Sequence, residues 1–347
     1  MDIFNYIENS KNEIIAEINT LDAMIFTRLS YIHLEDIIDK LPIKISDIIN
    51  YFNDIKISHN DKKLVNLLSE SNRFKDILIK RCKYIEDIDK ALIFKATTIM
   101  LPDHSLFISF RGTGKNIYDF REDMNMSYTE IPSCIEGVKY LEEEKRFNKL
   151  FISGHSKGGH VAIYAASHTT FFNKVKLEKV YNFDGPGFLE ITKELKTIQS
   201  KIVNYFPESS IVGRIMHSVG EIIPIKTNKQ GIEAHSIYNW KIDNNDLIKG
   251  ELTNNSNLFH EECLNILKII PKEKRKSIID HIFTLMLKGE IKSIKELDLI
   301  KVKEILNNTP HLDKEEKDEL IKFFKVFIKC SMPEIIHKNN KLTIENE

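Results

Sequence analysis

The chain has 347 residues, of which 50 are Lys or Arg and 51 are Asp or Glu, so its formal net charge is -1. This near-balance provides no global electrostatic field that would favour nucleic acids or acidic membranes as partners. With 42% hydrophobic residues, the chain can bury the core of one large domain, or of a domain with a smaller companion.

Targeting signals and metal-binding motifs are not visible in the sequence. Residues 1–5 carry neither the basic region nor the apolar stretch of a signal peptide, and no apolar run approaches the ~20 residues of a membrane helix. We therefore expect a cytoplasmic protein without cofactor or metal, for which a transient contact with a membrane surface stays open. The widely spaced cysteines are expected to be reduced packing residues: Cys82, Cys134, Cys263 and Cys330.

Residues 1–90 are predicted to form a helical segment that packs on the core. Apolar residues recur at helical spacing over residues 14–21 and again over residues 24–32. Asp22 is a candidate cap for the second of these helices. The pair Leu41-Pro42 interrupts the helical pattern, because a proline disfavours helical backbone at the residue before it.

The pattern changes at about residue 91, where strands begin to alternate with helices. Residues 91–101 and 105–110 are rich in β-formers and predict a β-hairpin. Further strands are expected before residue 156 and at 179–183, 201–206 and 221–226, with helices at 132–146, 161–167, 188–198 and 211–219. This alternation indicates a mostly parallel sheet with helical crossovers in a core of residues 91–244. Residues 245–347 are predicted to be a helical C-terminal region and a candidate cap.

The stretch Gly154-His155-Ser156-Lys157-Gly158 lies between a β-rich apolar run and a run of helix formers. Gly-x-Ser-x-Gly in this setting is the nucleophile elbow of α/β-hydrolases. The two glycines are needed because the serine backbone turns sharply and a Cβ on either side would clash. The pattern predicts Ser156 as the nucleophile and the backbone N–H of Lys157 as an oxyanion donor. The alternative is a structural turn whose serine has no chemical role.

The general base is expected after Ser156, because α/β-hydrolases carry the serine, the acid and the histidine in this chain order. His235 follows the last predicted strand and is the first candidate. The remaining candidates lie in predicted helices or beside the serine, where packing roles are more natural: His155, His160, His217 and His260.

Two carboxylates are candidates for the acid that orients this base. Asp184 follows the strand at 179–183, and Glu208 follows the strand at 201–206. Because the carboxyl ends of parallel strands meet at one sheet edge, either carboxylate could reach His235. We favour Asp184, although Asp-Gly-Pro-Gly is also a turn signature in its own right.

A second oxyanion donor is expected in the loop after the predicted hairpin. Gly112 and Thr113 lie there, and Thr113 offers its backbone N–H together with its hydroxyl. Arg111 and Asp123 are candidate partners that would fix the loop by pairing with each other.

Phe110-Arg111-Gly112-Thr113 followed by Gly154-His155-Ser156-Lys157-Gly158-Gly159 resembles the pattern of class 3 lipases. The chain is still more similar to the Mbeg1-like family, which is related to those lipases, in the stretches 21–31, 110–125, 182–188, 207–213, 235–240 and 270–273. These resemblances imply an α/β-hydrolase fold, a nucleophilic Ser156 and an oxyanion role for Thr113.

The chain departs from the class 3 lipases at one position. Those enzymes carry an Asp in the loop after the strand equivalent to residues 201–206, and the best match here is Ser210, which cannot act as the acid. Either Asp184 or Glu208 substitutes, or the triad is incomplete. The first hypothesis is a serine esterase, lipase-like, that cleaves lipid or acyl esters through an acyl-enzyme; a peptidase or thioesterase would use the same scaffold. The second is a catalytically weak or inactive α/β-hydrolase-fold protein that binds a lipid or protein partner.

Overall fold

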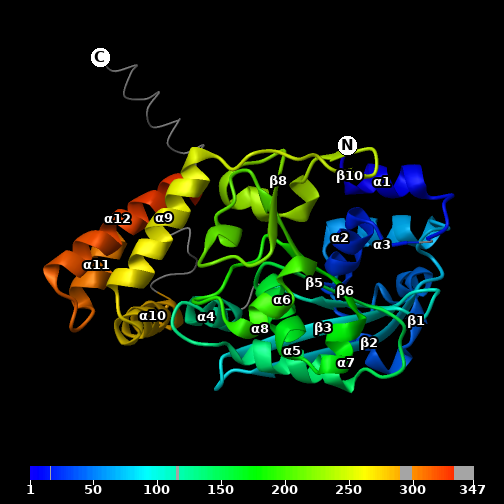
Figure 1. The fold of residues 1–347 in the computed structure, drawn as a ribbon, viewed down its shortest axis with the longest axis horizontal. Coiled ribbons are helices and arrows are strands. Elements are labelled where there is room, and N and C mark those ends of the chain that lie inside the picture. Colours follow the sequence, from blue (N-terminus) through cyan, green and yellow to red (C-terminus); the bar gives the residue numbers. More distant parts are fainter. Residues whose placement is uncertain (16, 115–116, 290–298, 332–347) are drawn as a thin grey trace, which may run out of the picture.

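An eight-stranded sheet forms the centre of the computed structural model, which describes residues 1–15, 17–114, 117–289 and 299–331 (Figure 1). The strands follow one another in chain order across the sheet. Neighbouring strands are antiparallel from β1 to β4 and parallel from β4 to β8. The strands are β1 Ile43–Lys44, β2 Leu78–Asp87, β3 Leu92–Met100, β4 Leu106–Phe110, β5 Leu150–His155, β6 Leu177–Phe183, β7 Ile202–Pro207 and β8 Glu221–Ile225.

The helices between the parallel strands pack on one face of the sheet. Because right-handed crossovers that always advance in the same direction return on the same side, one core forms there. It brings Ile108, Ile152 and Val180 of the strands against Val161 and Ala165 of the helix after β5. The helices between β4 and β7 are α4 Ile117–Asn125, α5 Pro132–Glu143, α6 Lys157–His168, α7 Phe171–Lys176 and α8 Lys193–Thr197.

The opposite face, which the crossovers leave open, is covered by the N-terminal helices (Figure 1). Phe26 and Leu64 of these helices share a core with Phe107 and Phe183 of the sheet and with Trp240 from the segment after β8. The helices are α1 Ile3–Ser10, α2 Thr20–Leu29 and α3 His59–Glu70. Short 3-10 helices complete the segments around the sheet: η1 Leu34–Lys40, η2 Ile45–Tyr51, η3 Gln199–Lys201, η4 Val212–Arg214, η5 Gly231–His235 and η6 Ile237–Asn239.

The C-terminal helices pack into a core of their own at one end of the molecule (Figure 1). They contact the rest through α4, where Arg121 lies 3.3 Å from Asp280, and through the loop after β7, where Ser256 donates to the Ser210 carbonyl at 2.7 Å. The C-terminal helices are α9 Asn254–Ile269, α10 Lys272–Leu287, α11 Leu299–Asn308 and α12 Lys314–Ser331. The hairpin of β9 Ile242–Asp243 and β10 Asp246–Leu247 precedes them and packs in the same core as the N-terminal helices.

The α/β-hydrolase fold predicted from the sequence is confirmed by the mostly parallel sheet, its flanking helices and the strand–turn–helix unit around residue 156. The hairpin at residues 91–110 and the strands at 179–183, 201–206 and 221–226 are also confirmed. The expected helices at 188–198 and 211–219 are shorter in the structure, because only α8 and η4 form there.

The N-terminal ninety residues are not all helical. Residues 78–87 form β2, which pairs with β3 over its whole length. Charged side chains interrupt the alternation in this strand, so the neighbouring strand rather than an apolar pattern specifies it. Ile14 and Ile15 lie outside any helix, since α2 begins after its N-cap Asn19. Asp22 is not the cap itself: its side chain accepts from the Asn19 N–H and completes a capping box.

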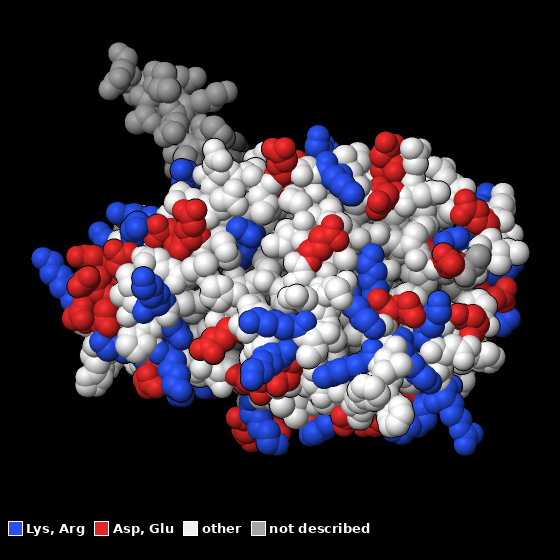
Figure 2. Space-filling view, in the orientation of Figure 1, with Lys and Arg blue, Asp and Glu red and all other residues white. Residues whose placement is uncertain are grey.

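The surface matches the near-neutral charge of the sequence. Acidic and basic side chains are interspersed over the face that Figure 2 shows. Across the described ranges, no helix combines the length and the apolar character needed to cross a membrane. The four cysteines are buried and free, as predicted for packing residues.

Candidate active site

Ser156 occupies the turn between β5 and α6 with φ 59° and ψ -135°. A non-glycine residue rarely adopts a positive φ, and such strain persists only where the surroundings enforce it. Here a Cβ on Gly154 would lie 1.9 Å from the Gly158 carbonyl oxygen, and one on Gly158 would lie 2.1 Å from the Phe110 carbonyl oxygen. Both glycines are therefore required for the close packing that holds the half-buried Ser156 at the carboxyl end of β5.

Asp184 and His235 are in direct contact at the same edge of the sheet. Asp184 follows β6 and is 1% exposed, and its Oδ2 lies 2.6 Å from Nδ1 of His235. Its Oδ1 accepts from the Ser210 hydroxyl and from the backbone N–H of Gly213, the latter at 3.1 Å. Because a carboxylate accepts, the proton of His235 resides on Nδ1, which leaves Nε2 free to act as a base.

The imidazole of His235 lies beside the nucleophile strand. Its ring stacks on that of His155, with the centroids 4.4 Å apart and the planes at 29°, and Ser156 is the next residue in the chain. Within the described ranges, no hydrogen bond joins the Ser156 hydroxyl to the His235 imidazole. Such bonds between nucleophile and base often tighten only when substrate is present.

The other candidates for acid and base lie elsewhere. Glu208 hydrogen-bonds through its backbone to Ile225 and Thr253, and its side chain covers Gly250. His217 pairs with the backbone of Phe188, and His260 contacts the Arg214 carbonyl at 2.8 Å. In the part of the chain that the structure describes, none of the hydrogen bonds and ion pairs connects Glu208, His217 or His260 to the imidazole of His235.

The loop after β4 packs directly against the elbow. A Cβ on Gly112 would lie 2.4 Å from the His155 carbonyl oxygen and 2.8 Å from the Ser156 Cβ, so Thr113 is close to the nucleophile. The Thr113 hydroxyl donates to Asp123 at 2.5 Å, and burial raises the pKa of Asp123 to about 7.

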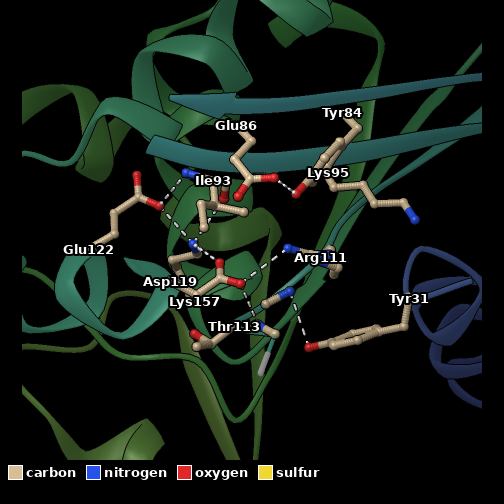
Figure 3. A network of polar contacts seen from close by, with 12 residues as sticks. Tyr31, Tyr84, Glu86, Ile93, Lys95, Arg111, Thr113, Asp119, Glu122 and Lys157 are labelled. Atoms are coloured by element: carbon tan, nitrogen blue, oxygen red, sulfur yellow. Dashed lines mark hydrogen bonds and ion pairs between the residues drawn. The ribbon is translucent and has the colours of Figure 1, made fainter. Parts of the chain in front are cut away.

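The pair expected between Arg111 and Asp123 does not form. Arg111 instead lies 3.4 Å from Asp119, which also accepts from the Gly114 N–H at 3.0 Å (Figure 3). Asp119 lies at the start of α4, where its carboxylate can receive several donors of the loop at once. The loop is thus held by two carboxylates: Asp119 contacts Arg111 and Gly114, and Asp123 contacts Thr113.

The side chain of Lys157 forms a buried network that the sequence interpretation missed. Its Nζ donates to Asp119 at 3.1 Å, to Glu122 at 2.7 Å and to the Ile93 carbonyl at 3.0 Å (Figure 3). Lys157 is 2% exposed, and the carboxylates raise its pKa above the usual value against the effect of burial. The i, i+3 spacing of Asp119 and Glu122 places both carboxylates on one face of a helix, and this spacing could have indicated a shared cationic partner. The network anchors Lys157, the first residue of α6, which directly follows Ser156.

The two histidines that flank the serine have structural contacts. His160 is buried against Phe188, and its Nδ1 contacts the Gly187 carbonyl at 2.7 Å. Burial lowers the pKa of His160 to about 4. The ring of His155 lies between Tyr31 and His235.

The described residues include no group of three or more His, Cys, Asp or Glu side chains arranged to hold a metal ion. What they do bring together is a strained serine, an imidazole bonded to a carboxylate, and a loop that packs against the serine turn and carries the backbone N–H of Thr113. Acyl transfer by a serine nucleophile requires this combination of groups.

Three comparisons relate the chain to known proteins. No curated protein matches it. Among solved structures, M37 lipase is 16% identical with a TM-score of 0.37, over 57% of this chain and 70% of that one. A mutant form of MDLA from Penicillium cyclopium and a structure described as fungal lipases are each 13% identical, with TM-scores of 0.41 and 0.40, over 68% of this chain and 88% of theirs.

These TM-scores are below 0.5, so the fold assignment rests on the topology of the sheet and on the elbow. The model of the Mbeg1-like family matches residues 68–284, which is more than half of the chain, and the chain therefore belongs to the Mbeg1-like family.

Proposed function

We propose that this protein is a serine hydrolase that cleaves carboxylic esters through an acyl-enzyme. The observation that carries the proposal is the 2.6 Å contact between Asp184 and Nδ1 of His235 at the sheet edge where Ser156 is held with a positive φ. A serine hydroxyl is a poor nucleophile without a neighbouring base, and an oriented imidazole supplies that base.

In the proposed reaction, the Ser156 hydroxyl attacks the ester carbonyl while Nε2 of His235 takes its proton. The backbone N–H groups of Lys157 and Thr113 stabilise the oxyanion of the tetrahedral intermediate. His235 then returns the proton to the departing alcohol, which leaves an acyl group on Ser156. Water, activated by the same imidazole, releases the acid, and Asp184 stays ionised throughout to stabilise the imidazolium.

The substrate class is proposed from the motifs. The stretches Arg111-Gly112-Thr113 and Gly154-His155-Ser156 resemble class 3 lipases, so lipid and acyl esters are the first substrates to test. A peptidase or thioesterase would use the same groups. The cytoplasmic location and the role of the helices after residue 253 as a cap stay predictions.

A second candidate function is a catalytically weak or inactive protein that binds a lipid or a protein partner. The observation in its favour is that no hydrogen bond joins Ser156 to His235 within the described residues. If the Ser156 hydroxyl and the His235 imidazole stayed unbonded in solution even with substrate present, the hydroxyl would not be activated.

Labelling by a fluorophosphonate probe separates the two functions. We expect wild-type protein to label, Ser156→Ala to lose labelling completely, and hydrolysis of p-nitrophenyl acetate to be lost in parallel. Ser69→Ala is the control, since Ser69 lies in α3 and its hydroxyl donates to the Asn66 carbonyl within the same helix. A folded wild-type protein that neither labels nor hydrolyses the ester would exclude the esterase and favour the binding protein.

A further inference from the structure

We propose that Tyr31 and His155 are positioning residues that hold the oxyanion loop and the base loop at a fixed separation across the nucleophile strand. The inference rests on the proposed function. The Gly112 N–H donates to the Tyr31 hydroxyl at 3.1 Å, and that hydroxyl lies 2.8 Å from Nδ1 of His155. On the other side of the ring, Nε2 of His155 lies 2.8 Å from the His235 carbonyl oxygen.

The chemistry of these groups determines which atom donates in each of these three hydrogen bonds. The His235 carbonyl can only accept, so Nε2 of His155 carries the proton and Nδ1 carries the lone pair. The Tyr31 hydroxyl must then donate to Nδ1, and its oxygen accepts from the Gly112 N–H. The Tyr31 hydroxyl also lies 3.5 Å from the His155 carbonyl oxygen, but its contact with Nδ1 is much shorter. The hydrogen bonds therefore run without interruption from Gly112 to His235.

Both bridging side chains stay neutral in the physiological range. Burial and the neighbouring His235 lower the pKa of His155 well below its usual value. Burial raises the pKa of Tyr31 to about 12. A neutral imidazole keeps one donor and one acceptor, so the direction of the chain does not change with pH near neutrality.

Tyr31 is itself held from two sides of the fold. The Arg28 guanidinium lies 4.3 Å from the centre of the Tyr31 ring and 5.3 Å from that of Tyr238, and it forms a bidentate pair with Asp61 at 2.6 and 2.8 Å. The Tyr238 hydroxyl donates to the same carboxylate at 2.6 Å. Because Tyr238 is three residues from His235, this cluster connects the N-terminal helices to the base loop a second time.

The position of this series of hydrogen bonds, from Gly112 through Tyr31 and His155 to His235, indicates its role in catalysis. His155 belongs to the nucleophile strand, so the two ends of the hydrogen-bond series, Gly112 and His235, lie on either side of that strand near Ser156. At one end the Gly112 amide orients Thr113; at the other, the His155 ring supports one face of the imidazole whose Nδ1 edge is bonded to Asp184. Both contacts position groups that stabilise the transition state in the proposed reaction, namely the oxyanion donor Thr113 and the base His235. A small displacement of either group would lower the rate of the reaction.

Figure 3 shows that Tyr31 reaches this loop from the side of the N-terminal helices, opposite to Lys157, Asp119 and Glu122. The family match begins at residue 68, so it does not include Tyr31. The role proposed for Tyr31 is inferred from its contacts with Gly112 and His155.

The test compares Tyr31→Phe with Tyr6→Phe. Tyr6 is a matched control, because its hydroxyl also donates once, to Asp22 at 3.0 Å, and accepts once, from Asn19 at 2.9 Å, on the same face of the sheet. We expect Tyr31→Phe to lower kcat for p-nitrophenyl acetate by ~10- to 100-fold with little change in KM. We expect Tyr6→Phe to keep the wild-type kcat. An active wild-type protein with an equally active Tyr31→Phe variant would overturn the inference.

A second measurement does not depend on activity. Nitrogen-15 NMR of the histidine side chains should show His155 as the Nε2–H tautomer and His235 as the Nδ1–H tautomer in the wild-type protein. Tyr31→Phe should shift the resonances of both rings, and Tyr6→Phe should leave them in place. A His155 protonated on Nδ1, or rings that do not respond to Tyr31→Phe, would refute the positioning role even if the protein proved not to be an esterase.

Discussion

The hydroxyl of Ser210 donates a hydrogen bond to Oδ1 of Asp184, while Oδ2 of the same carboxylate contacts His235. By resemblance, Ser210 stands where class 3 lipases carry their acid. The loop after β7 thus supports a carboxylate that lies at the end of the adjacent strand β6, and we propose that this carboxylate is the acid. The buried carboxylate retains three partners in this arrangement, which include the Gly213 N–H.

Asp184→Asn tests this assignment of the acid. The amide keeps the shape of the side chain but stabilises the wrong tautomer of His235, so we expect kcat to fall by roughly 10³- to 10⁴-fold. Steady-state hydrolysis of p-nitrophenyl esters measures the effect. Glu208→Gln is the matched control and should keep the wild-type kcat. Equal losses in the two variants, or a loss in Glu208→Gln alone, would be inconsistent with Asp184 as the acid.

Ser210→Ala tests the support of the carboxylate. Without the hydroxyl, Oδ1 of Asp184 keeps only the Gly213 N–H, and the orientation of His235 is less well defined. We expect kcat to fall by about 10-fold, since a hydrogen bond to a charged group contributes about 1.5 kcal/mol. The hydroxyl of neighbouring Ser209 is buried with no hydrogen-bond partner among the described residues, so Ser209→Ala should have little effect. Full activity in Ser210→Ala would show that this hydrogen bond is dispensable.

Asp123 should make stability depend on pH. A carboxyl in the unfolded chain titrates near pH ~3.9, whereas burial raises the pKa of Asp123 in the folded state to about 7. Between these values the folded state binds more protons, so the free energy of unfolding falls as pH rises from about 4 to about 7. The stabilisation is fully present below that range and is lost above it.

Urea unfolding of the wild-type protein and of Asp123→Asn at several pH values measures this effect. Relative to the variant, the wild-type protein should lose about 4 kcal/mol between pH ~4 and pH ~8, because a difference of ~3 pKa units corresponds to about 4 kcal/mol. Asp243, which is exposed in β9, provides the control, and Asp243→Asn should follow the wild-type curve. Parallel pH curves for the wild-type protein and Asp123→Asn would contradict the prediction.

Lys157→Met should destabilise the fold. The substitution removes the only cation that directly contacts both Asp119 and Glu122 among the described residues, and it leaves two buried carboxylates without their common partner. We expect a loss of about 3–5 kcal/mol in the free energy of unfolding. The triple variant Lys157→Met/Asp119→Asn/Glu122→Gln, which is neutral throughout, should recover part of that loss. A triple variant less stable than Lys157→Met alone would show that charge pairing is not the cause.

The prediction of the elbow from sequence succeeded because its requirements lie within a few consecutive residues. A positive φ at Ser156 and contacts below 2.5 Å for any Cβ at Gly154 or Gly158 leave few other residue types possible. The parallel order of β4 to β8 was similarly accessible, because strands that alternate with helices repeat a local pattern. By contrast, β2 was missed because its pairing with β3, and not its own composition, makes it a strand.

The sequence by itself determined the fold class, the serine at the turn and a short set of candidate partners for it. Only the tertiary structure decided which carboxylate lies beside His235, since Asp184 and Glu208 leave the same sheet edge and differ in what packs around them. It also decided that Tyr31 reaches His155 across 124 residues of chain, and that the Lys157 side chain turns inward to α4. The physical reason is that steric and periodic signals act between near neighbours, whereas hydrogen-bond partners far apart in the chain meet only after the sheet and both of its faces have packed.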